Sequence, residues 1–566
     1  MKLLTLHVDY INFKPLKKAL KSIEDLSEKE KEGKKVGESL VVLTAVEKGD
    51  SVDESVKELI NNVKDIAKQV KAKEIVLYPY AHLSSNLSKP DVAVSVLDEA
   101  EKKLKKDFKV SKAPFGYYKE FELKVKGHPL SELSREIVVK VDETDSENID
   151  TVNLLRSIGK TILDRSKLKD YDHRILGQEM DLFSFNDVAP GMAFWHNNGL
   201  IVYNELVNFM KEELRKREYK EIRTPEILDK KLWQISGHWE KYRENIFLSK
   251  YEDREFASKP MNCPGGLIVF KNEPKSYKDL PLRVAEFGIV HRQELSGVLA
   301  GLFRVVEFTQ DDAHIFCSEK QMEDEIRNII ELTDSIYKKF GFSYKVELST
   351  RPEKRIGGDK RWDKAEKALE SVLKNDKIKY KINKGDGAFY GPKIDFHIKD
   401  ALGRSWQLGT IQLDFSMPQR FELEYTDKDN KRKIPVMIHR AIFGSLERFI
   451  GVLLEHTKGR LPTWIAPIQV RVLSFTDRNE KYGKEVIKKL GEEIPNLRVD
   501  ADFRSTTIPS KVKDAELSKV PYIIVVGDKE EKSGEIAVRT RGDKKIEKMK
   551  VSDFVKSLKK EIKGRI

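Results

Sequence analysis

Two apolar runs that flank a glycine-containing turn constrain the fold of this chain more than any other feature. AEFGIVHRQEL, from Ala285, is typical of a buried strand, SGVLAG of a turn, and LFRVVEF of a second strand that carries Arg304. The pattern predicts two antiparallel strands that hold Arg292 and Arg304 near one loop. A guanidinium group is planar and permanently charged, so arginines on rigid strands suit the phosphates of a nucleoside triphosphate. A surface hairpin whose arginines pair with Glu294 and Glu307 explains the same residues equally well.

The sequence FTQDDAHIF follows this pattern directly and adds polar side chains next to an apolar strand. Alternation would direct some of Gln310, Asp311, Asp312 and His314 into one cleft. The hairpin resembles motif 2 of the class II aminoacyl-tRNA synthetases, and TQDDAHIF resembles the threonyl-tRNA synthetases in particular. The resemblance implies that ATP, Mg²⁺, L-threonine and tRNA(Thr) are the partners of this chain, and that Gln310 and Asp312 contact threonine.

Length and charge set wider bounds. A chain of 566 residues is too long for one core and predicts three or four domains. The net charge of +12 fits an RNA partner, although a surplus spread over this length is also ordinary solubility charge. Two cysteines cannot form a disulfide framework in such a chain. Because we find no signal peptide and no apolar run of about 18 residues, we expect a soluble, cytoplasmic protein without a membrane partner.

The order of predicted elements indicates a multidomain chain of the α/β and α+β classes. The resemblance assigns four parts, which are an N-terminal α/β editing domain (1–145), a helical linker (146–180), a class II catalytic core on an antiparallel sheet (181–465) and a C-terminal α/β anticodon-binding domain (466–566). In the first part, KAPFGYYKEFELKVKG predicts a hairpin and HPLSELSREI predicts a short turn and helix.

Polar residues gather at the predicted strand ends of the first domain. His82 follows an apolar strand, Tyr118 and Lys119 follow a Pro-Phe-Gly turn, and Glu132 follows His-Pro. His82 could equally be an ordinary residue at a helix start, and tyrosines often lie at the edge of a core. These stretches resemble the archaeal editing domain of the threonyl-tRNA synthetases, which is akin to the D-aminoacyl-tRNA deacylases. The resemblance implies that the four residues line a pocket that hydrolyses mischarged seryl-tRNA(Thr).

Cys263, in KPMNCPGG, is by itself typical of a buried structural thiol. Its distance in sequence from His314 and His439 is too wide for a local zinc finger. The resemblance nevertheless implies that the three residues bind one Zn²⁺ per subunit and leave a fourth ligand position open. Such a metal would accept the amino and hydroxyl groups of threonine and reject valine. Serine keeps both groups, so a second site for editing would be needed.

Further stretches extend the resemblance to motifs 1 and 3. A long predicted helix and a strand into Pro225 resemble motif 1 and imply a homodimer, although the helix could pack on its own domain. RAIFGSLERFIG resembles motif 3 and implies that Arg448 joins Arg292 and Arg304 on ATP. In SGHWEKY, His238 is a candidate for proton transfer to tRNA, because an imidazole ordinarily takes a proton near neutral pH.

The remaining implied contacts lie on later strands. Tyr390 and Gln412 would face threonine, although half-exposed polar residues are normal on an antiparallel sheet. Glu530 and Arg539 would read anticodon bases or form an ordinary surface ion pair. Ser505 stands where relatives commonly have asparagine, which puts that base contact in doubt. Two rival functions are a prolyl or seryl specificity and an RNA-binding paralogue without catalysis.

Overall fold

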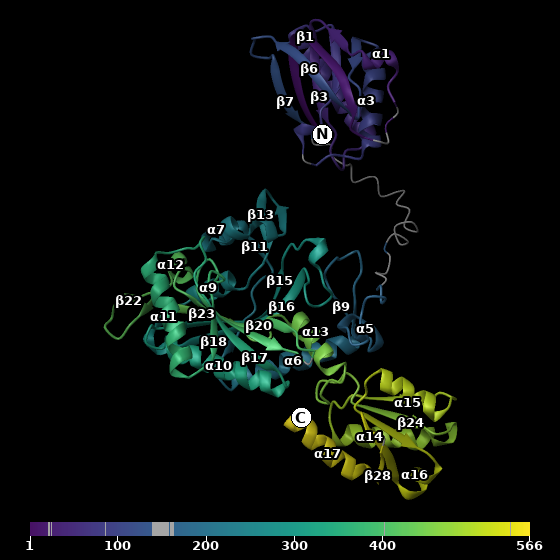
Figure 1. The fold of residues 1–566 in the computed structure, drawn as a ribbon, viewed down its shortest axis with the longest axis vertical. Coiled ribbons are helices and arrows are strands. Elements are labelled where there is room, and N and C mark those ends of the chain that lie inside the picture. The colour runs from purple at the N-terminus through teal and green to yellow at the C-terminus, as the bar shows by residue number, and fades with distance from the viewer. Residues whose placement is uncertain are drawn as a thin grey trace. The chain divides into compact units, whose positions relative to one another are not determined.

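The computed structural model describes residues 1–20, 23, 25–84, 86–137, 158, 163–400, 402–543 and 545–565 (Figure 1). The chain forms two compact units, Met1–Asn153 and Leu154–Ile566. The predicted boundary at residue 145 and the first part of the predicted linker lie outside the described residues, apart from residue 158. The described end of that linker contains the short helix α5 (His173–Glu179). In the described parts of the chain, no helix combines the length and the apolar composition that crossing a membrane requires.

The N-terminal unit is one seven-stranded sheet with two long helices. Its elements are β1 (Lys2–Lys18), α1 (Glu28–Lys31), β2 (Lys34–Val36), β3 (Ser39–Ala45), α2 (Val52–Val70), β4 (Glu74–Pro79), η1 (Ala81–Leu83), α3 (Pro90–Leu104), β5 (Lys109–Lys112), β6 (Tyr117–Val125) and β7 (Glu132–Glu136). The strand order is β2-β1-β3-β4-β5, and β6 and β7 both pair with β1. Helices α2 and α3 are amphipathic, and their buried faces share one core with apolar residues of β1, β3 and β4.

Two predictions for this unit are wrong. The predicted hairpin after Lys112 does not form, because β5 pairs with β4 whereas β6 pairs with β1. The predicted helix in HPLSELSREI is the strand β7, which pairs antiparallel with the start of β1 from Glu132 to Glu136. The long strand β1 offers unpaired backbone groups along its whole edge, and pairing satisfies them. Tertiary pairing thus overrides the local pattern of these short segments.

The second unit is built on an eight-stranded sheet in the order β10-β15-β16-β23-β20-β19-β17-β18. Its strands are β10 (Lys220–Glu221), β15 (Leu282–His291), β16 (Glu307–Cys317), β17 (Ser343–Ser349), β18 (Tyr380–Asn383), β19 (Lys393–Lys399), β20 (Ser405–Asp414) and β23 (Val436–Ala441). Only the two edge pairs, β10–β15 and β17–β18, are parallel. The predicted antiparallel core is therefore confirmed.

Helices and short strands complete this part of the unit. The helices are α6 (Asn197–Arg215), α7 (Lys230–Ser236), α8 (His238–Tyr242), η3 (Arg243–Asn245), α9 (Cys263–Lys271), η4 (Tyr277–Asp279), η5 (Ser296–Val298), α10 (Met322–Lys339), α11 (Asp359–Asn375), α12 (Met417–Arg420) and α13 (Leu446–Thr457). The short strands are β8 (Phe183–Ser184), β9 (Phe194–Trp195), β11 (Ile227–Asp229), β12 (Leu248–Tyr251), β13 (Arg254–Ser258), β14 (Lys275–Ser276), β21 (Tyr425–Thr426) and β22 (Arg432–Lys433). Apolar residues of α6, α10, α11 and α13 pack against the large sheet in one continuous core.

The pair of strands that the sequence predicted around Arg292 and Arg304 exists with shifted bounds. β15 and β16 are antiparallel, and His291 pairs with Glu307 where the two strands meet the loop. Arg304 lies in that loop, residues 292–306, and not on the second strand as predicted. The polar run after Glu307 is itself the strand, so its alternation decides which side chains face the cavity.

The C-terminal part is a five-stranded mixed sheet with helices, as predicted. Its elements are β24 (Val470–Ser474), η6 (Asp477–Asn479), α14 (Glu480–Glu493), β25 (Val499–Asp502), α15 (Ile508–Leu517), β26 (Tyr522–Val526), α16 (Asp528–Ser533), β27 (Glu535–Thr540), β28 (Ile546–Lys550) and α17 (Val551–Gly564). The order is β25-β24-β26-β27-β28, in which the first three strands are parallel and the last two antiparallel. Apolar residues of α14 and α17 pack on this sheet.

Candidate active site

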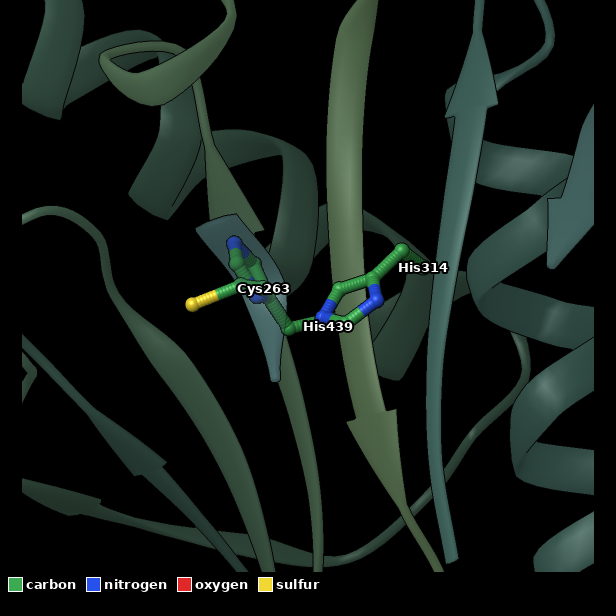
Figure 2. Close-up of side chains that lie close together, drawn as sticks. All are labelled: Cys263, His314 and His439. Atoms are coloured by element: carbon green, nitrogen blue, oxygen red, sulfur yellow. The ribbon is translucent and has the colours of Figure 1, made fainter. Parts of the chain in front are cut away.

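Cross-strand register brings together the three residues assigned to a metal. His314 on β16 and His439 on β23 are direct partners in the antiparallel ladder, so their side chains are neighbours on one face. Cys263 is the first residue of α9. One ligand atom from each of the three lies within 4.8 Å of the others (Figure 2). Residues that lie far apart in sequence thus form one cluster.

The donor set of this cluster fits a zinc ion. All three side chains are buried, and Nε2 of His314 has no hydrogen-bond partner among the described residues. Nε2 of His439 lies 3.1 Å from Oδ2 of Asp414, which orients the ring. Burial, with the charges of Asp312 and Asp414, raises the pKa of the Cys263 thiol well above its usual value. Cysteine thiolates and histidine imidazoles are common ligands of tetrahedral Zn²⁺ in proteins.

A cavity of about 500 Å³ opens beside the cluster. Cys263 and His439 line it, whereas the buried His314 is not among its lining residues. The other residues assigned from the sequence that line this cavity are Arg292, Arg304, Gln310, Asp312, Tyr390, Gln412 and Arg448. Seven assigned side chains and two of the three metal candidates therefore face one space.

Two of the three arginines have no carboxylate partner in the described structure. Arg292 donates from Nε to the carbonyl of Pro260 at 3.1 Å, and Arg448 donates from Nε to the carbonyl of Phe303 at 2.9 Å. Burial, with the positive charges of Arg292 and Arg304, lowers the pKa of Arg448. Such mutual repulsion between cations that share a cavity would be relieved by a bound anion.

Arg304 follows in part the alternative interpretation of the hairpin. Its Nη2 lies 3.0 Å from Oε2 of Glu294, and its side chain is half exposed. Glu307, the other proposed partner, pairs instead with His291 at 3.0 Å. Glu294 itself lines the cavity, so the pair lies at the mouth of the site and not on a remote surface.

Three of the four residues assigned to threonine lie on β16 and β20, the strands on either side of β23, and Tyr390 lies in the turn before β19. Gln412 on β20 is the ladder partner of His439, and the hydroxyl of Tyr390 donates to its Oε1 at 2.9 Å. Gln310, Asp312 and His314 are spaced two residues apart on β16, so their side chains share a face. Its Oδ2 accepts from Nδ2 of Asn262 at 3.3 Å. These groups offer donors and acceptors for a small polar ligand.

His238 is placed differently from the other assigned residues. It is fully buried at the start of α8, is not among the cavity-lining residues, and its Nδ1 lies 2.7 Å from Oγ of Ser236. Burial, with the positive charges of His439, Arg292 and Arg420, lowers its pKa to about 3. The reason for choosing His238, an ordinary imidazole pKa, therefore does not hold in this arrangement.

Asp311 has a structural role that the sequence did not reveal. It lies on the face of β16 opposite to its neighbours and is almost fully buried. Its carboxylate accepts from the backbone nitrogens of Ile442, Phe443 and Gly444 at 2.9 to 3.1 Å. Asp311 therefore fixes the turn that leads into α13 and Arg448. The sequence signal that could have shown this is the alternation of side chains along β16, which places Asp311 on the face opposite to Gln310 and Asp312.

A second cavity, of about 480 Å³, lies in the N-terminal unit. His82, Tyr118 and Lys119 line it, as assigned. Nζ of Lys119 donates to the carbonyls of Pro114 and Tyr117 at 2.8 and 3.0 Å, and burial lowers its pKa to about 8. Glu132 is exposed on β7 and is not among the lining residues, so the structure does not bring it to this cavity.

The two residues assigned to the anticodon do not meet each other. Glu530 on α16 lies 3.1 Å from Nζ of Lys548, and Arg539 on β27 lies 2.5 Å from Oε1 of Glu516. The alternative interpretation expected Glu530 and Arg539 to pair with each other. Each forms an ion pair, but with a different partner.

Three family models match the chain. They are the tRNA synthetase class II core domain (G, H, P, S and T) at residues 247–457, the archaea-specific editing domain of threonyl-tRNA synthetase at residues 1–137 and an anticodon binding domain at residues 469–561. The three matches fall on the three predicted domains in the predicted order.

Curated relatives match the larger part of the chain. The threonine–tRNA ligase of Clostridium tetani (strain Massachusetts / E88) is 50% identical over 423 residues, which are 73% of this chain and 66% of that protein. The threonine–tRNA ligase of Desulforamulus reducens is 51% identical over 397 residues, which are 70% of this chain and 62% of that protein. The chain therefore spans slightly less than two thirds of the length of these relatives.

Solved structures agree with these matches. The RNA binding domain of threonyl-tRNA synthetase from Cryptosporidium parvum is 42% identical with a TM-score of 0.67, and the match covers 69% of this chain and 98% of that one. ThrRS-1 of Aeropyrum pernix is 30% identical with a TM-score of 0.62, over 70% of this chain and 96% of that one. A prolyl-tRNA synthetase of Cryptosporidium parvum, 16% identical with a TM-score of 0.55, covers 72% of this chain and 77% of its own and shares the fold alone.

Proposed function

Because this chain belongs to the threonyl-tRNA synthetase family, we propose that it activates L-threonine with ATP and transfers the threonyl group to the 3′ end of tRNA(Thr). The observation that carries the proposal is one cavity where three arginines face two of the three metal candidates. A binding-only paralogue has no physical need for either group. Mg²⁺ would accompany ATP.

The first step needs charge stabilisation at phosphorus. The threonine carboxylate attacks the α-phosphorus of ATP, the bond to the β-phosphate oxygen breaks, and pyrophosphate leaves with the electron pair. Arg292 and Arg448 lack carboxylate partners in the described structure, so their charge is free for phosphate oxygens. Arg304 would exchange its pair with Glu294 for a phosphate. The 3′-hydroxyl oxygen of the terminal adenosine of the tRNA then attacks the carbonyl carbon of the adenylate, the acyl–phosphate bond breaks, AMP leaves with the electron pair, and the hydroxyl proton is released.

Specificity would come from the groups beside the arginines. Gln310, Asp312, Tyr390 and Gln412 would hold the amino and hydroxyl groups of threonine by hydrogen bonds, and an analogue without the hydroxyl would leave them unpaired. Cys263, His314 and His439 would hold one Zn²⁺ per subunit. When bound, this ion would supply a Lewis-acidic position for the same two groups of threonine.

A second site is proposed for the removal of serine. Serine differs from threonine by one methyl group, a difference that binding alone discriminates by only about 1–3 kcal/mol. The cavity of the N-terminal unit would bind the terminal adenosine of seryl-tRNA(Thr), with His82, Tyr118 and Lys119 beside the ester. A role of Glu132 remains a prediction that would need the bound RNA to reach β7.

Three further assignments complete the proposal. The C-terminal part would bind the anticodon through Glu530 and Arg539, which would first leave their present ion pairs. A homodimer through the region of α6 and a cytoplasmic location are proposed from the family alone. His238 would influence transfer to tRNA only after a rearrangement that exposes it.

Amino-acid-dependent exchange of pyrophosphate into ATP tests the proposal directly. Zinc-loaded protein is expected to support exchange with threonine, weaker exchange with serine and none with valine. Exchange with proline instead, or with serine above threonine, would establish a rival specificity. A protein that binds tRNA and supports no exchange with any amino acid would be the non-catalytic paralogue.

A further inference from the structure

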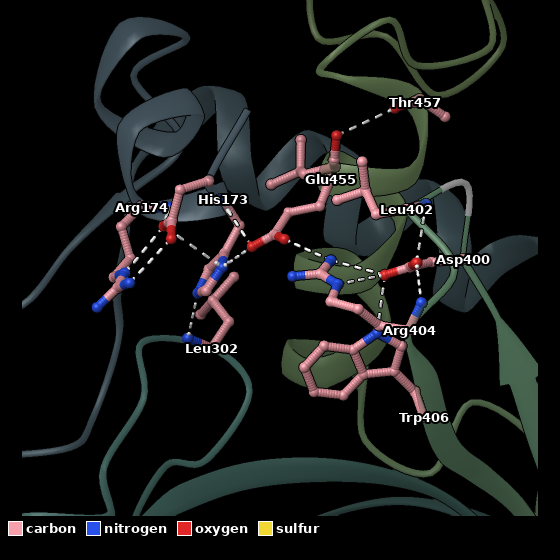
Figure 3. Close-up of polar contacts among 11 residues, drawn as sticks. His173, Arg174, Leu302, Asp400, Leu402, Arg404, Trp406, Glu455 and Thr457 are labelled. Carbon is pink, nitrogen blue, oxygen red and sulfur yellow. Dashed lines mark hydrogen bonds and ion pairs between the residues drawn. The ribbon is translucent and has the colours of Figure 1, made fainter. Parts of the chain in front are cut away.

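A largely buried chain of polar contacts joins α5, α13 and the loop that carries Arg304, and none of its residues is assigned to a substrate (Figure 3). Its centre is His173, the first residue of α5, whose side chain is only 1% exposed. Nδ1 of His173 lies 2.6 Å from Oε1 of Glu455 on α13. The backbone nitrogen of Leu302, in the loop 292–306, donates to Nε2 of His173 at 3.0 Å. One ring thus connects α5, α13 and the loop 292–306.

These contacts define the tautomer of the ring. A backbone nitrogen can only donate, so Nε2 of His173 is unprotonated and accepts from Leu302. Nδ1 then carries the proton and donates to Glu455. Burial alone would raise the pKa of Glu455, but the bonds from His173 and the ion pair with Arg404 leave it below its usual value. The oxygens and nitrogen of Asp172, His173 and Glu455 lie close enough for a cation, but both ring nitrogens are already occupied.

The far side of Glu455 is fixed as well. Its Oε2 lies 2.5 Å from Nη2 of Arg404. Arg404 also pairs with Asp400, which accepts from Nε1 of Trp406 at 2.9 Å. The carboxylate of Glu455 therefore cannot turn away from His173 without giving up its ion pair with Arg404, whose side chain is partly exposed.

The loop residue Phe303 connects this chain of contacts to the cavity. Its ring centroid lies 4.1 Å from that of His173 and 4.3 Å from that of Trp406. Its carbonyl accepts from Nε of Arg448 at 2.9 Å, and Phe303 and Arg304 both line the cavity. The position of Phe303 therefore affects Arg448, which donates to its carbonyl, and Arg304, which follows it in the chain.

The loop approaches His173 so closely that only glycine fits at position 301. Gly301 has φ of +54°, and a Cβ atom there would lie 2.3 Å from Nε2 of His173. Loop and ring thus have complementary shapes, and the hydrogen bond from Leu302 is the polar contact between them.

We propose that His173 is a positioning residue for the ATP site, which holds the backbone of Leu302 and Phe303 and through it the carbonyl that orients Arg448. The inference rests on the proposed function, because that function assigns these arginines to ATP. It adds a residue of the predicted linker, which does not line the cavity, to the determinants of nucleotide affinity.

Two amide variants separate the bonds of the two ring nitrogens. In H173Q the side-chain carbonyl can replace Nε2 as the acceptor for Leu302, whereas in H173N the amide can replace Nδ1–H as the donor to Glu455. Both variants keep the backbone bond from residue 173 to Glu455. If His173 only stabilises the fold, the two variants should behave alike.

The measurement is the dissociation constant of the non-hydrolysable ATP analogue AMP-PNP with Mg²⁺, obtained by calorimetry, together with the KM values for ATP and threonine in pyrophosphate exchange. For H173N we expect roughly tenfold weaker AMP-PNP binding and an equal rise of KM for ATP, because a buried backbone donor loses its acceptor. KM for threonine should stay unchanged. H173Q should remain within about twofold of wild type, as should the control Q178A, which alters an exposed residue of α5.

Equal AMP-PNP affinities of H173N and H173Q, or a joint rise of both KM values, would overturn the inference. A wild type that binds AMP-PNP without exchange would overturn the proposed function, and the affinity ratio of the two variants would still decide the inference. A wild type that does not bind AMP-PNP would overturn both.

Discussion

Each ligand candidate has an ordinary explanation on its own, and only their register makes them a site. Cys263 resembles a buried structural thiol, and His314 and His439 are 125 residues apart in the sequence. The ladder between β16 and β23 makes the two histidines direct neighbours, and Nε2 of His314 then lacks a partner among the described residues. An unsatisfied buried nitrogen is costly unless something binds it.

Replacing Cys263 by serine should therefore remove the metal. We expect zinc content, measured by atomic absorption after dialysis, to fall from about one ion per chain to well below half. Cys317→Ser is the matched control, because Cys317 is also buried and lies on β16 with His314, but is not part of the cluster. Equal zinc content in the two variants would contradict the assignment of Cys263.

Glu447 predicts a pH dependence of stability. Its carboxyl is buried, accepts from the backbone nitrogen of Thr309 at 2.9 Å and faces the charge of Glu307 and the ring of Tyr203. Burial raises its pKa to about 8, against about 4.3 in an unfolded chain. Between these values the folded state binds the extra proton, so this group's contribution to stability falls as pH rises, by at most about 1.4 kcal/mol per pH unit.

Glu447→Gln removes that proton equilibrium and keeps an acceptor for Thr309. We expect the unfolding midpoint of the wild type to decline relative to that of the variant between pH 5.5 and 7.5. Parallel midpoints over this range would show that the carboxyl is ionised in the folded state.

At the scale of elements, the sequence predicted long periodic segments well and short ones poorly. The long helix α6 and the apolar strand β15 follow from their patterns, because the spacing of their apolar residues is regular. β7 and the start of β16 did not follow, because pairing with β1 and β15 decided them. Arg304 was accordingly assigned to the site but placed on a strand and not in the loop.

The same limit applies to the site. The family resemblance named nine of the residues that line the larger cavity, but the burial of His238, the exposure of Glu132 and the turn held by Asp311 depend on three-dimensional packing. The pKa of His238 is lowered mainly by burial, and burial is a property of the folded molecule that no sequence pattern reveals.

Packing between β15 and α9 predicts the effect of one glycine. A Cβ atom on Gly288 would lie 2.0 Å from Oδ1 of Asn262, which directly precedes Cys263 at the start of α9. Gly288→Ala should therefore lower the free energy of unfolding by about 1–3 kcal/mol and weaken zinc binding, because α9 has to shift. Gly297→Ala is the control, since a Cβ atom there meets nothing within 4 Å. Thermal unfolding and zinc titration measure both effects. Unchanged zinc affinity in the Gly288 variant would mean that the cluster does not depend on this packing.

At the scale of the whole molecule, two cavities of similar volume lie in two separate compact units. The cavities share no lining residue. Their chemistry also differs, since the larger is surrounded by arginines and metal candidates, whereas the smaller is lined largely by apolar and aromatic side chains around one partly buried lysine. Synthesis and correction by one chain would require this kind of independence.

Independence of the two cavities predicts a separation of activities. Lys119→Met keeps the apolar stem but removes the ammonium group that donates to Pro114 and Tyr117. We expect threonine-dependent exchange to stay at the wild-type rate, while deacylation of seryl-tRNA(Thr) falls roughly a hundredfold, the usual effect of losing one electrostatic contact to a reacting ester. Lys124→Met makes the same change on the same strand, β6, where the lysine is exposed and pairs with Asp9. It should leave both rates unchanged. If both variants lost deacylation equally, or if Lys119→Met also slowed exchange, the lysine would act on the fold and not on a second reaction.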